Sequence, residues 1–550
     1  MKRWGILLII AICVALSGCT ISHETDTPSD SKGVMSQDQV LNLASHHPLT
    51  TLDTDKLTQF GRLNNTIEGL YQATSNNDTE LALAKKVKIS ADKQTYTFTL
   101  WKDSHWSNGD VITAPDFVFS WRRALMPKTK APEADLFDGI KNARQILDGE
   151  LPASQLGVTA PSKFKLVVHL DHPMAELPQR LAYPLFGPQN RRIAIKYGNL
   201  YATKPRYQVY AGPFMVANRG SSKWRWHMIP NPHYWDRKHV YLSRINVVTY
   251  KSATTAWDAY DHGRLDEMRI IGKSDVKYYE KKADYTARPY SKMVLLNYRQ
   301  TGKNSKTNRL LQQKLARLAI SHAINRKHLV KEAYGNTSLT AQGVVPAGLS
   351  RGLKGTADFA AAQPEQATLA YSPKTAKAEW QTATKRAGVD HMSLSLGYLS
   401  DSNSPAVAKT LKHQLEANLP GLTITLKKHV QALNVRAVPV TSDLTLTTQR
   451  AQYADPLAVL SLFTSNNSAN VGHWSSKTYD QLIDRASNAP TFNSKRWQTL
   501  LSAEGLLMRD QGVTPLIQPA STYLVDPKLN GVLYNTIGTQ SNFKSAYFVK

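Results

Sequence analysis

The stretch WSNGDVITAPDFVFSW, residues 106–121, contains a well-defined helix start. Pro115 and Asp116 stand at the first helical positions, and apolar residues at helical spacing follow them. On either side, residues 93–100 and 163–170 alternate apolar and polar side chains, which predicts half-buried strands. Helical and strand patterns alternate along the whole chain without a fixed repeat, so we expect an α/β architecture of more than one domain.

The C-terminal half continues this alternation. Residues 310–334 predict a pair of amphipathic helices, and residues 407–419 predict a helix that leads into a strand at 422–426. Further strand patterns lie at 394–398 and 443–446. Together these segments outline one α/β lobe.

The N-terminus predicts export. A charged start, Met1-Lys2-Arg3, is followed by an apolar run at residues 4–16 and then by small residues, as in a signal peptide over residues 1–18. The apolar run has roughly 13 residues, whereas a membrane-spanning helix needs about 20. We therefore expect an extracytoplasmic protein without a membrane-spanning helix.

A lipid anchor is the second expectation for this region. Leu16-Ser17-Gly18-Cys19 resembles the bacterial lipobox, which implies that Cys19 is lipidated and holds the protein at the outer face of the cytoplasmic membrane. The alternative is an ordinary thiol beside a conventional cleavage site. Residues 19–35 would then be the lipidated cysteine and a flexible polar tether. Cys13, the other cysteine, lies inside the signal, so the mature chain has no disulfide.

The chain is strongly basic, with a formal net charge of +26. Nucleic acid is the usual partner of such a protein, but export argues against it, and the Lys and Arg residues are spread along the chain. Anionic lipid head groups and cell-wall polymers fit an exported protein better. A solvated basic surface with no specific partner stays an open alternative.

Signatures of catalysis are weak. Residues 348–352 match the G-x-S-x-G spacing of a nucleophile elbow, but Pro346 before them and Gly355 after them predict a loop. His46 and His47 are adjacent and cannot share one helix face as metal ligands would. The sequence contains no H-E-x-x-H, C-x-x-C or Walker A motif. We expect no enzymatic activity, no metal and no cofactor.

Several motifs resemble those of family 5 solute-binding proteins, the peptide and nickel receptors of ABC importers. Besides residues 106–121, the resemblance rests on the segments 64–71, 211–214, 231–236, 316–326, 453–456 and 515–527. It implies an α/β fold of the type II periplasmic-binding-protein kind, with two lobes, three domains, a hinge and a ligand cleft between the lobes. The implied boundaries are 36–75 with 200–288 and 517–550 for lobe one, 76–199 for an inserted domain, and 289–516 for lobe two.

The resemblance also implies a function. The protein would be a monomer that captures oligopeptides and delivers them to an ABC permease, which works with separate ATPase subunits. An extended peptide is held mainly by backbone hydrogen bonds in such a cleft. A receptor for a peptide signal, or a binder of a non-peptide solute such as a metal chelate or haem, remains an alternative on the same scaffold.

The expected binding segment departs from the family pattern. Most relatives hold the peptide's ammonium terminus with an aspartate, and here Gln452 occupies that position, while Gln449 replaces the preceding aromatic residue. Tyr453 belongs to the same segment. Asp455 and Asp443 are candidates to replace the missing carboxylate, although Asp455 before a proline is also a common turn initiator. Arg436 and Arg450 would favour a ligand with carboxylates if they face the cleft, and both may equally be surface charges.

Overall fold

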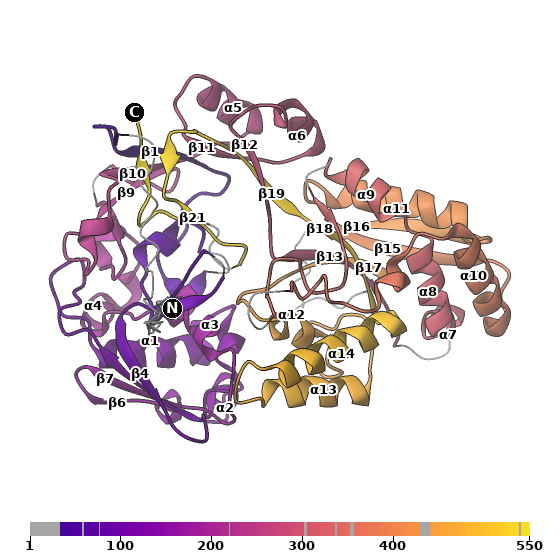
Figure 1. Ribbon diagram of the computed structural model, residues 1–550, viewed down its shortest axis with the longest axis horizontal. Coiled ribbons are helices and arrows are strands. Elements are labelled where there is room, and N and C mark those ends of the chain that lie inside the picture. The colour runs from indigo at the N-terminus through magenta and orange to yellow at the C-terminus, as the bar shows by residue number, and fades with distance from the viewer. Residues whose placement is uncertain are drawn as a thin grey trace, which may run out of the picture.

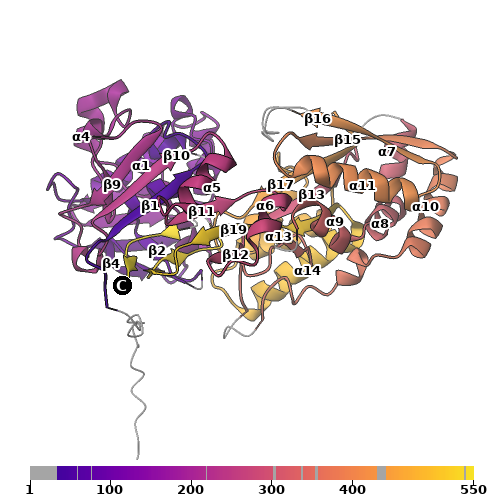
Figure 2. The same cartoon turned by 90° about the horizontal axis from the view of Figure 1, so that it is seen from above.

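The structure is a computed structural model that describes residues 34–57, 60–75, 77–218, 220–301, 305–335, 338–352, 357–429, 441–537 and 541–550. The chain forms two lobes that lie side by side, with strands crossing between them (Figures 1 and 2). A third, smaller body that contains β4–β7 packs beneath lobe one (Figure 1).

Lobe one is built on a mixed seven-stranded sheet. Its strands, in order across the sheet, are β12 (Tyr285–Pro289), β19 (Ala520–Val525), β11 (Glu267–Ile270), β1 (Val40–Ser45), β10 (Arg244–Thr249), β9 (Arg225–Pro230) and β8 (Phe214–Val216). β1 is central and runs parallel to both neighbours. Leu41 and Leu43 on β1 are fully buried, as expected for alternate positions that face a core. Helices α5 (Ala253–Asp261) and α6 (Lys273–Tyr279) lie next to β11 and β12 (Figure 1).

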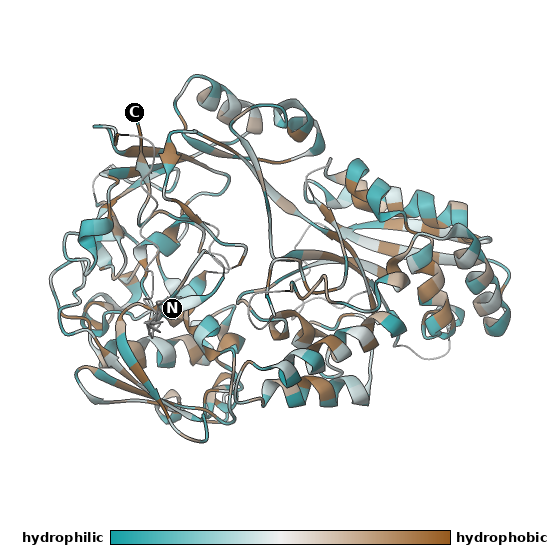
Figure 3. Ribbon diagram, viewed as in Figure 1, coloured by the Kyte–Doolittle hydropathy of each residue, from teal (hydrophilic) through white to brown (hydrophobic). Residues whose placement is uncertain are grey.

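Lobe two is built on a six-stranded sheet. Its strands, in order, are β14 (Leu339–Thr340), β18 (Val513–Gln518), β13 (Lys292–Tyr298), β17 (Leu444–Arg450), β15 (Met392–Leu399) and β16 (Leu422–His429). β15 and β16 are parallel and are joined by α11 (Ser404–Asn418), so the predicted helix and strands of this region are confirmed. Helices α10 (Pro373–Ala387) and α11 each carry both hydrophilic and hydrophobic residues (Figure 3). Trp380 of α10 lies on the buried side and is fully buried.

The helix pair predicted at residues 310–334 is confirmed as the second and third of three consecutive short helices. They are α7 (Lys306–Leu311), α8 (Lys314–His322) and α9 (Arg326–Ala333). Gln313 and Asn325 are the N-cap residues of α8 and α9, and the Asn325 side chain accepts a hydrogen bond from the backbone of His328. A capping side chain competes with helix continuation, which a pattern of apolar residues alone does not reveal.

The third body contains the stretch quoted at the start. Its antiparallel sheet has the order β4 (Ala84–Ile89), β5 (Thr95–Leu100), β7 (Lys165–His169) and β6 (Val158–Ser162). Helix α1 (Ala114–Leu125) begins at the predicted place, with the Asp116 carboxylate accepting a hydrogen bond from Thr113 N at 2.9 Å. Trp106 and Trp121 are buried, and the Trp121 indole donates to Phe186 O. The stretch is therefore core of this body.

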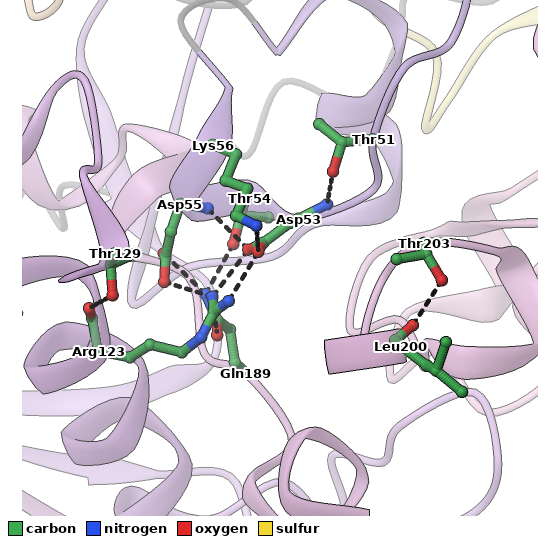
Figure 4. Close-up of polar contacts among 10 residues, drawn as sticks. All are labelled: Thr51, Asp53, Thr54, Asp55, Lys56, Arg123, Thr129, Gln189, Leu200 and Thr203. Atoms are coloured by element: carbon green, nitrogen blue, oxygen red, sulfur yellow. Dashed lines mark hydrogen bonds and ion pairs between the residues drawn. The ribbon is translucent and has the colours of Figure 1, made fainter. Parts of the chain in front are cut away.

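An ion-pair cluster connects α1 to lobe one (Figure 4). The Arg123 guanidinium donates to both carboxylate oxygens of Asp53 at 2.7 Å and to Asp55 at 2.5 Å. Gln189 donates to Asp55 from a third side at 2.8 Å. Asp53 and Asp55 are 3% and 0% exposed, so this network is shielded from water.

The hinge is a ribbon of two antiparallel strand pairs. β12 continues into β13 within the space of Tyr290 and Ser291, and β18 continues into β19 on the return. β12 pairs with β19 on the lobe one side, and β13 pairs with β18 on the lobe two side. Few backbone dihedrals need to change for the lobes to rotate about such a crossing, as in hinge closure around a ligand.

Helices α12 (Leu457–Leu460), α13 (Lys477–Ser487) and α14 (Ser494–Asp510) extend lobe two toward the third body (Figure 1). One continuous apolar core contains Leu181 of α3 (Leu177–Leu181) and Leu500 of α14. Helices α2 (Ala143–Leu147) and α4 (Arg191–Tyr197) complete the third body. The fold also contains three short two-stranded pairs among the described residues. These are β2 (Tyr71–Ala73) with β3 (Thr79–Leu81), β20 (Leu529–Asn530) with β23 (Tyr547–Phe548), and β21 (Leu533–Tyr534) with β22 (Ser541–Asn542). Within the described ranges, no helix combines the length and the apolar character that crossing a membrane requires.

Glu504 on α14 is a fully buried carboxyl group. It accepts a hydrogen bond from Val345 N at 2.8 Å, and burial raises its pKa from 4.5 to about 7. The folded protein therefore holds a proton at Glu504 in the pH range between these values, where the unfolded chain has lost it. The stabilising contribution of this proton is complete below pH 4.5 and disappears as the pH rises to about 7.

We expect Glu504→Gln to remove this pH dependence. The amide keeps an acceptor for Val345 and cannot ionise, so the variant should match the native protein near pH 5 and exceed it by about 2–3 kcal/mol near pH 8. Urea unfolding at both pH values measures the difference. Glu280→Gln, at an exposed position after α6, is the matched control. An equal change of stability with pH in both variants would contradict the prediction.

Candidate functional site

A cavity of about 480 Å³ lies where the two lobes meet at the hinge. From lobe one it is lined by the chain after β1, including His46 and His47, and by Arg269 of β11. Tyr290 of the hinge and Arg450 at the end of β17 line it from the other side. Its volume falls in the range of small-molecule sites, and residues from both lobes form its walls.

The lining of this cavity is cationic. It includes Lys56, Arg62, Arg269 and Arg450, and none of the described side chains that line it is an Asp or a Glu. The Arg62 guanidinium donates to the buried Glu267 at 2.5 Å. Lys56 lies 3.9 Å from Asp53, whereas no ion pair among the described residues includes Arg269.

Arg450 joins β17 to the third body. Its guanidinium donates to Glu133 at 3.0 Å, and the Tyr183 hydroxyl donates to the other oxygen of Glu133 at 2.6 Å. Arg450 thus lines the cavity with a charge that already has one carboxylate partner, and a ligand contact by Arg450 stays a prediction.

Gln452 lies in a small adjoining pocket. Tyr183, Gln179 and Asn77 are among its neighbours there, and none of the described residues lining that pocket is acidic. Gln449, on β17 opposite Met293, is half-buried. The lining of this pocket thus gives Gln452 no carboxylate partner, while a ligand contact by either glutamine stays a prediction.

Tyr453 and Asp455 point into the contact between lobe two and the third body. The Arg180 guanidinium lies 4.9 Å from the Tyr453 ring, whose side chain is buried. Asp455 is 1% exposed, and both of its oxygens accept hydrogen bonds from Arg496, at 2.7 and 3.0 Å. Arg496 also donates to Glu176 at 3.1 Å.

These contacts correct the expectation that Asp455 replaces the missing carboxylate. A carboxylate that is 1% exposed and whose charge is already paired with a guanidinium is not accessible to a ligand's ammonium group. Asp443 is similarly engaged, because Ser395 N and the Ser395 hydroxyl donate to one oxygen and Arg299 donates to the other. Cys19 and Arg436 lie outside the described residues.

The sequence reasoning missed Arg269 and Lys292. Lys292 begins β13, directly opposite Arg450 in the strand register. Burial, together with the nearby charges of Arg269 and Arg450, lowers the pKa of Lys292 to about 8. The available signal was an arginine between the apolar residues Met268 and Ile270 of β11, but nothing in the sequence places β11 beside β13.

Two further expectations from the sequence concern a nucleophile elbow at residues 348–352 and metal binding. Residues 348–352 form a loop, as predicted, rather than a strand-to-helix turn. Among the described residues, no group of three or more His, Cys, Asp or Glu side chains has a metal-binding arrangement.

Comparisons with known proteins agree with this geometry. Residues 78–470 match the family model described as bacterial extracellular solute-binding proteins, family 5 Middle. A dipeptide-binding protein of Lactococcus lactis subsp. cremoris is 33% identical over 512 residues, covering 90% of this chain and 92% of that protein.

Two solved structures share the fold. The substrate-binding domain of an oligopeptide ABC transporter from Bacillus anthracis has a TM-score of 0.77 and 31% identity, covering 94% of this chain and 100% of that one. The peptide-binding pheromone receptor PrgZ also has a TM-score of 0.77 and 31% identity, covering 93% and 100%. The two-lobed α/β fold with its hinge is thus shared, and this chain belongs to the bacterial extracellular solute-binding proteins of family 5.

Proposed function

We propose that this protein captures peptides in the cleft at the hinge and delivers them to the permease of an ABC importer. The observation that carries the proposal is the cavity of about 480 Å³ whose walls come from both lobes at a two-stranded crossing. Closure about that crossing would enclose a ligand. The similar proteins named as dipeptide-binding, oligopeptide-transporting and peptide-binding support a peptide as the ligand.

Several finer assignments belong to the same proposal. Cys19 carries a lipid anchor at the outer face of the cytoplasmic membrane, and the protein acts as a monomer without catalysing a reaction. Arg450 and Gln452 contact the ligand. The domains are 36–75 with 200–288 and 517–550, the insertion 76–199, and 289–516. The three sheets of more than two strands support this division.

A receptor for one peptide signal is the second candidate, supported by the 31% identity to a pheromone receptor. Mass spectrometry of ligand that co-purifies with the protein separates the two roles. A mixture of short peptides supports import, and one defined peptide supports signalling. A defined non-peptide solute, such as a metal chelate or haem, would contradict both.

Gln452 provides a direct test of how the peptide is held. We expect the native protein to bind a peptide and its N-acetylated form with affinities that differ by less than about tenfold, because no carboxylate lies beside Gln452 to pair with an ammonium group. Gln452→Asp should increase affinity for the free peptide by about tenfold or more and leave the acetylated peptide unchanged.

Isothermal titration calorimetry with both peptides measures these affinities. Gln452→Asn is the matched control, since it shortens the side chain equally without adding charge. A native preference for the free terminus of more than about tenfold would show that another group holds the ammonium.

A further inference from the structure

Cations from both lobes meet at the hinge. Arg269 comes from β11 of lobe one, whereas Lys292 and Arg450 stand at adjacent ends of β13 and β17 in lobe two. Burial is the largest cause of the lowered pKa of Lys292. The positive charges of Arg269 and Arg450 lower it further, because both lie near the Lys292 side chain. We call Arg269, Lys292 and Arg450 the hinge cations.

The carboxylates nearby do not balance this charge. Glu133 pairs with Arg450, and Glu267 pairs with Arg62. Among the described residues, no ion pair joins Arg269 or Lys292 to a carboxylate at this site, and Arg269 Nε is buried without a hydrogen-bond partner. A buried donor without a partner and an unpaired charge are costly, so this arrangement favours an anionic ligand from outside the chain.

The cavity itself offers a place for that counter-charge. Arg269 and Arg450 line it, and His46 and His47 add two further nitrogen-bearing side chains to the same wall. His46 lies close enough to Arg269 that the arginine, after burial, lowers the pKa of the imidazole. All these groups donate hydrogen bonds or carry positive charge when protonated, and a planar guanidinium suits a carboxylate in particular.

Resting on the peptide-binding function proposed above, we propose that the hinge cations select peptides with an acidic side chain, whose carboxylate binds Arg269 and neutralises the charge between the lobes. Without such a ligand, Arg269 on one lobe repels Lys292 and Arg450 on the other. The bound carboxylate replaces this repulsion by attraction from both sides. A negatively charged ligand therefore stabilises the closed arrangement of the lobes, in addition to making its own contact with Arg269.

A matched peptide series tests this selection. Ala-Glu-Ala, Ala-Gln-Ala and Ala-Lys-Ala, all with free termini, differ in charge only at the central residue. We expect the Glu peptide to bind the full-length mature protein at least about tenfold more tightly than the Gln peptide, and the Lys peptide to bind more weakly than either. Arg269→Gln should reduce the Glu-to-Gln ratio to about threefold or less while preserving affinity for the Gln peptide.

Two further variants control for charge and folding. Arg269→Lys keeps the positive charge and should retain part of the preference. Arg386→Gln removes the same charge from an exposed position on α10, far from the cleft (Figure 1), and should leave the ratio unchanged. Thermal unfolding of each variant shows whether it is folded.

The outcomes separate this inference from the function on which it rests. Equal affinity for the Glu and Gln peptides, or preference for the Lys peptide, overturns the charge selection and leaves peptide binding intact. An unchanged ratio in folded Arg269→Gln overturns the role of Arg269. If none of the peptides binds but glutarate does, the peptide function is wrong while selection for a carboxylate stands.

Discussion

Replacement of Arg496 by Met is expected to lower the free energy of unfolding by about 3–5 kcal/mol, because it leaves the buried Asp455 carboxylate without its guanidinium partner. Arg496 is fully buried and donates to Asp455 at 2.7 and 3.0 Å and to Glu176 at 3.1 Å. The Met side chain fills similar space, so the lost charge, rather than a cavity, dominates the effect. Equilibrium unfolding in urea measures it.

Arg509→Met is the control on the same helix. Arg509 pairs with Glu365 at 2.8 Å, but its side chain is 47% exposed, and exposed pairs contribute about 0.2–1 kcal/mol. A cost for Arg496→Met no larger than that for Arg509→Met would contradict the prediction. Adding Asp455→Asn to Arg496→Met should recover part of the lost stability, since it removes the stranded charge.

Arg123→Met is expected to have an effect of the same size, about 3–5 kcal/mol, in a different part of the molecule. Figure 4 shows its guanidinium directed at Asp53, Asp55 and Gln189. Both aspartates are buried, so the variant leaves the Asp53 carboxylate without its guanidinium partner and removes the charge that lowers the burial-raised pKa of Asp55. Urea unfolding at neutral pH measures the loss.

An exposed ion pair in the third body provides the comparison for Arg123. Arg192 on α4 pairs with Asp110 at the surface, and Arg192→Met should cause no measurable loss of stability. If Arg123→Met unfolds at the same urea concentration as the native protein, the cluster does not stabilise the attachment of α1 to lobe one. Asp55→Asn within Arg123→Met should restore part of the loss.

The two buried arginines act at different contacts. Arg123 connects the third body to lobe one, whereas Arg496 connects lobe two to the same third body through Glu176. The third body therefore holds buried ion pairs with both lobes in this arrangement. We expect hydrogen exchange of the backbone around α3 to increase in Arg496→Met and that around α1 to increase in Arg123→Met.

Much of the fold followed from the sequence because periodicity is a local property. The strand at Thr95–Leu100 and the helix at Ala114–Leu125 were expected and confirmed. Both rely on side chains within a few residues of each other. The helix pair expected at residues 310–334 is present as α8 and α9, and the Asn325 side chain caps the second of the two.

The family scaffold, and the glutamine Gln452 where relatives have an aspartate, can both be read from the order of residues along the chain. The partners of the neighbouring charges depend instead on how the chain folds in space. In the folded protein, Asp455 pairs with Arg496, and Arg269 of β11 lies near Lys292 and Arg450 at the hinge. The physical reason is that charge pairing depends on distance through space and on burial, and strands far apart in sequence meet only when the sheets assemble.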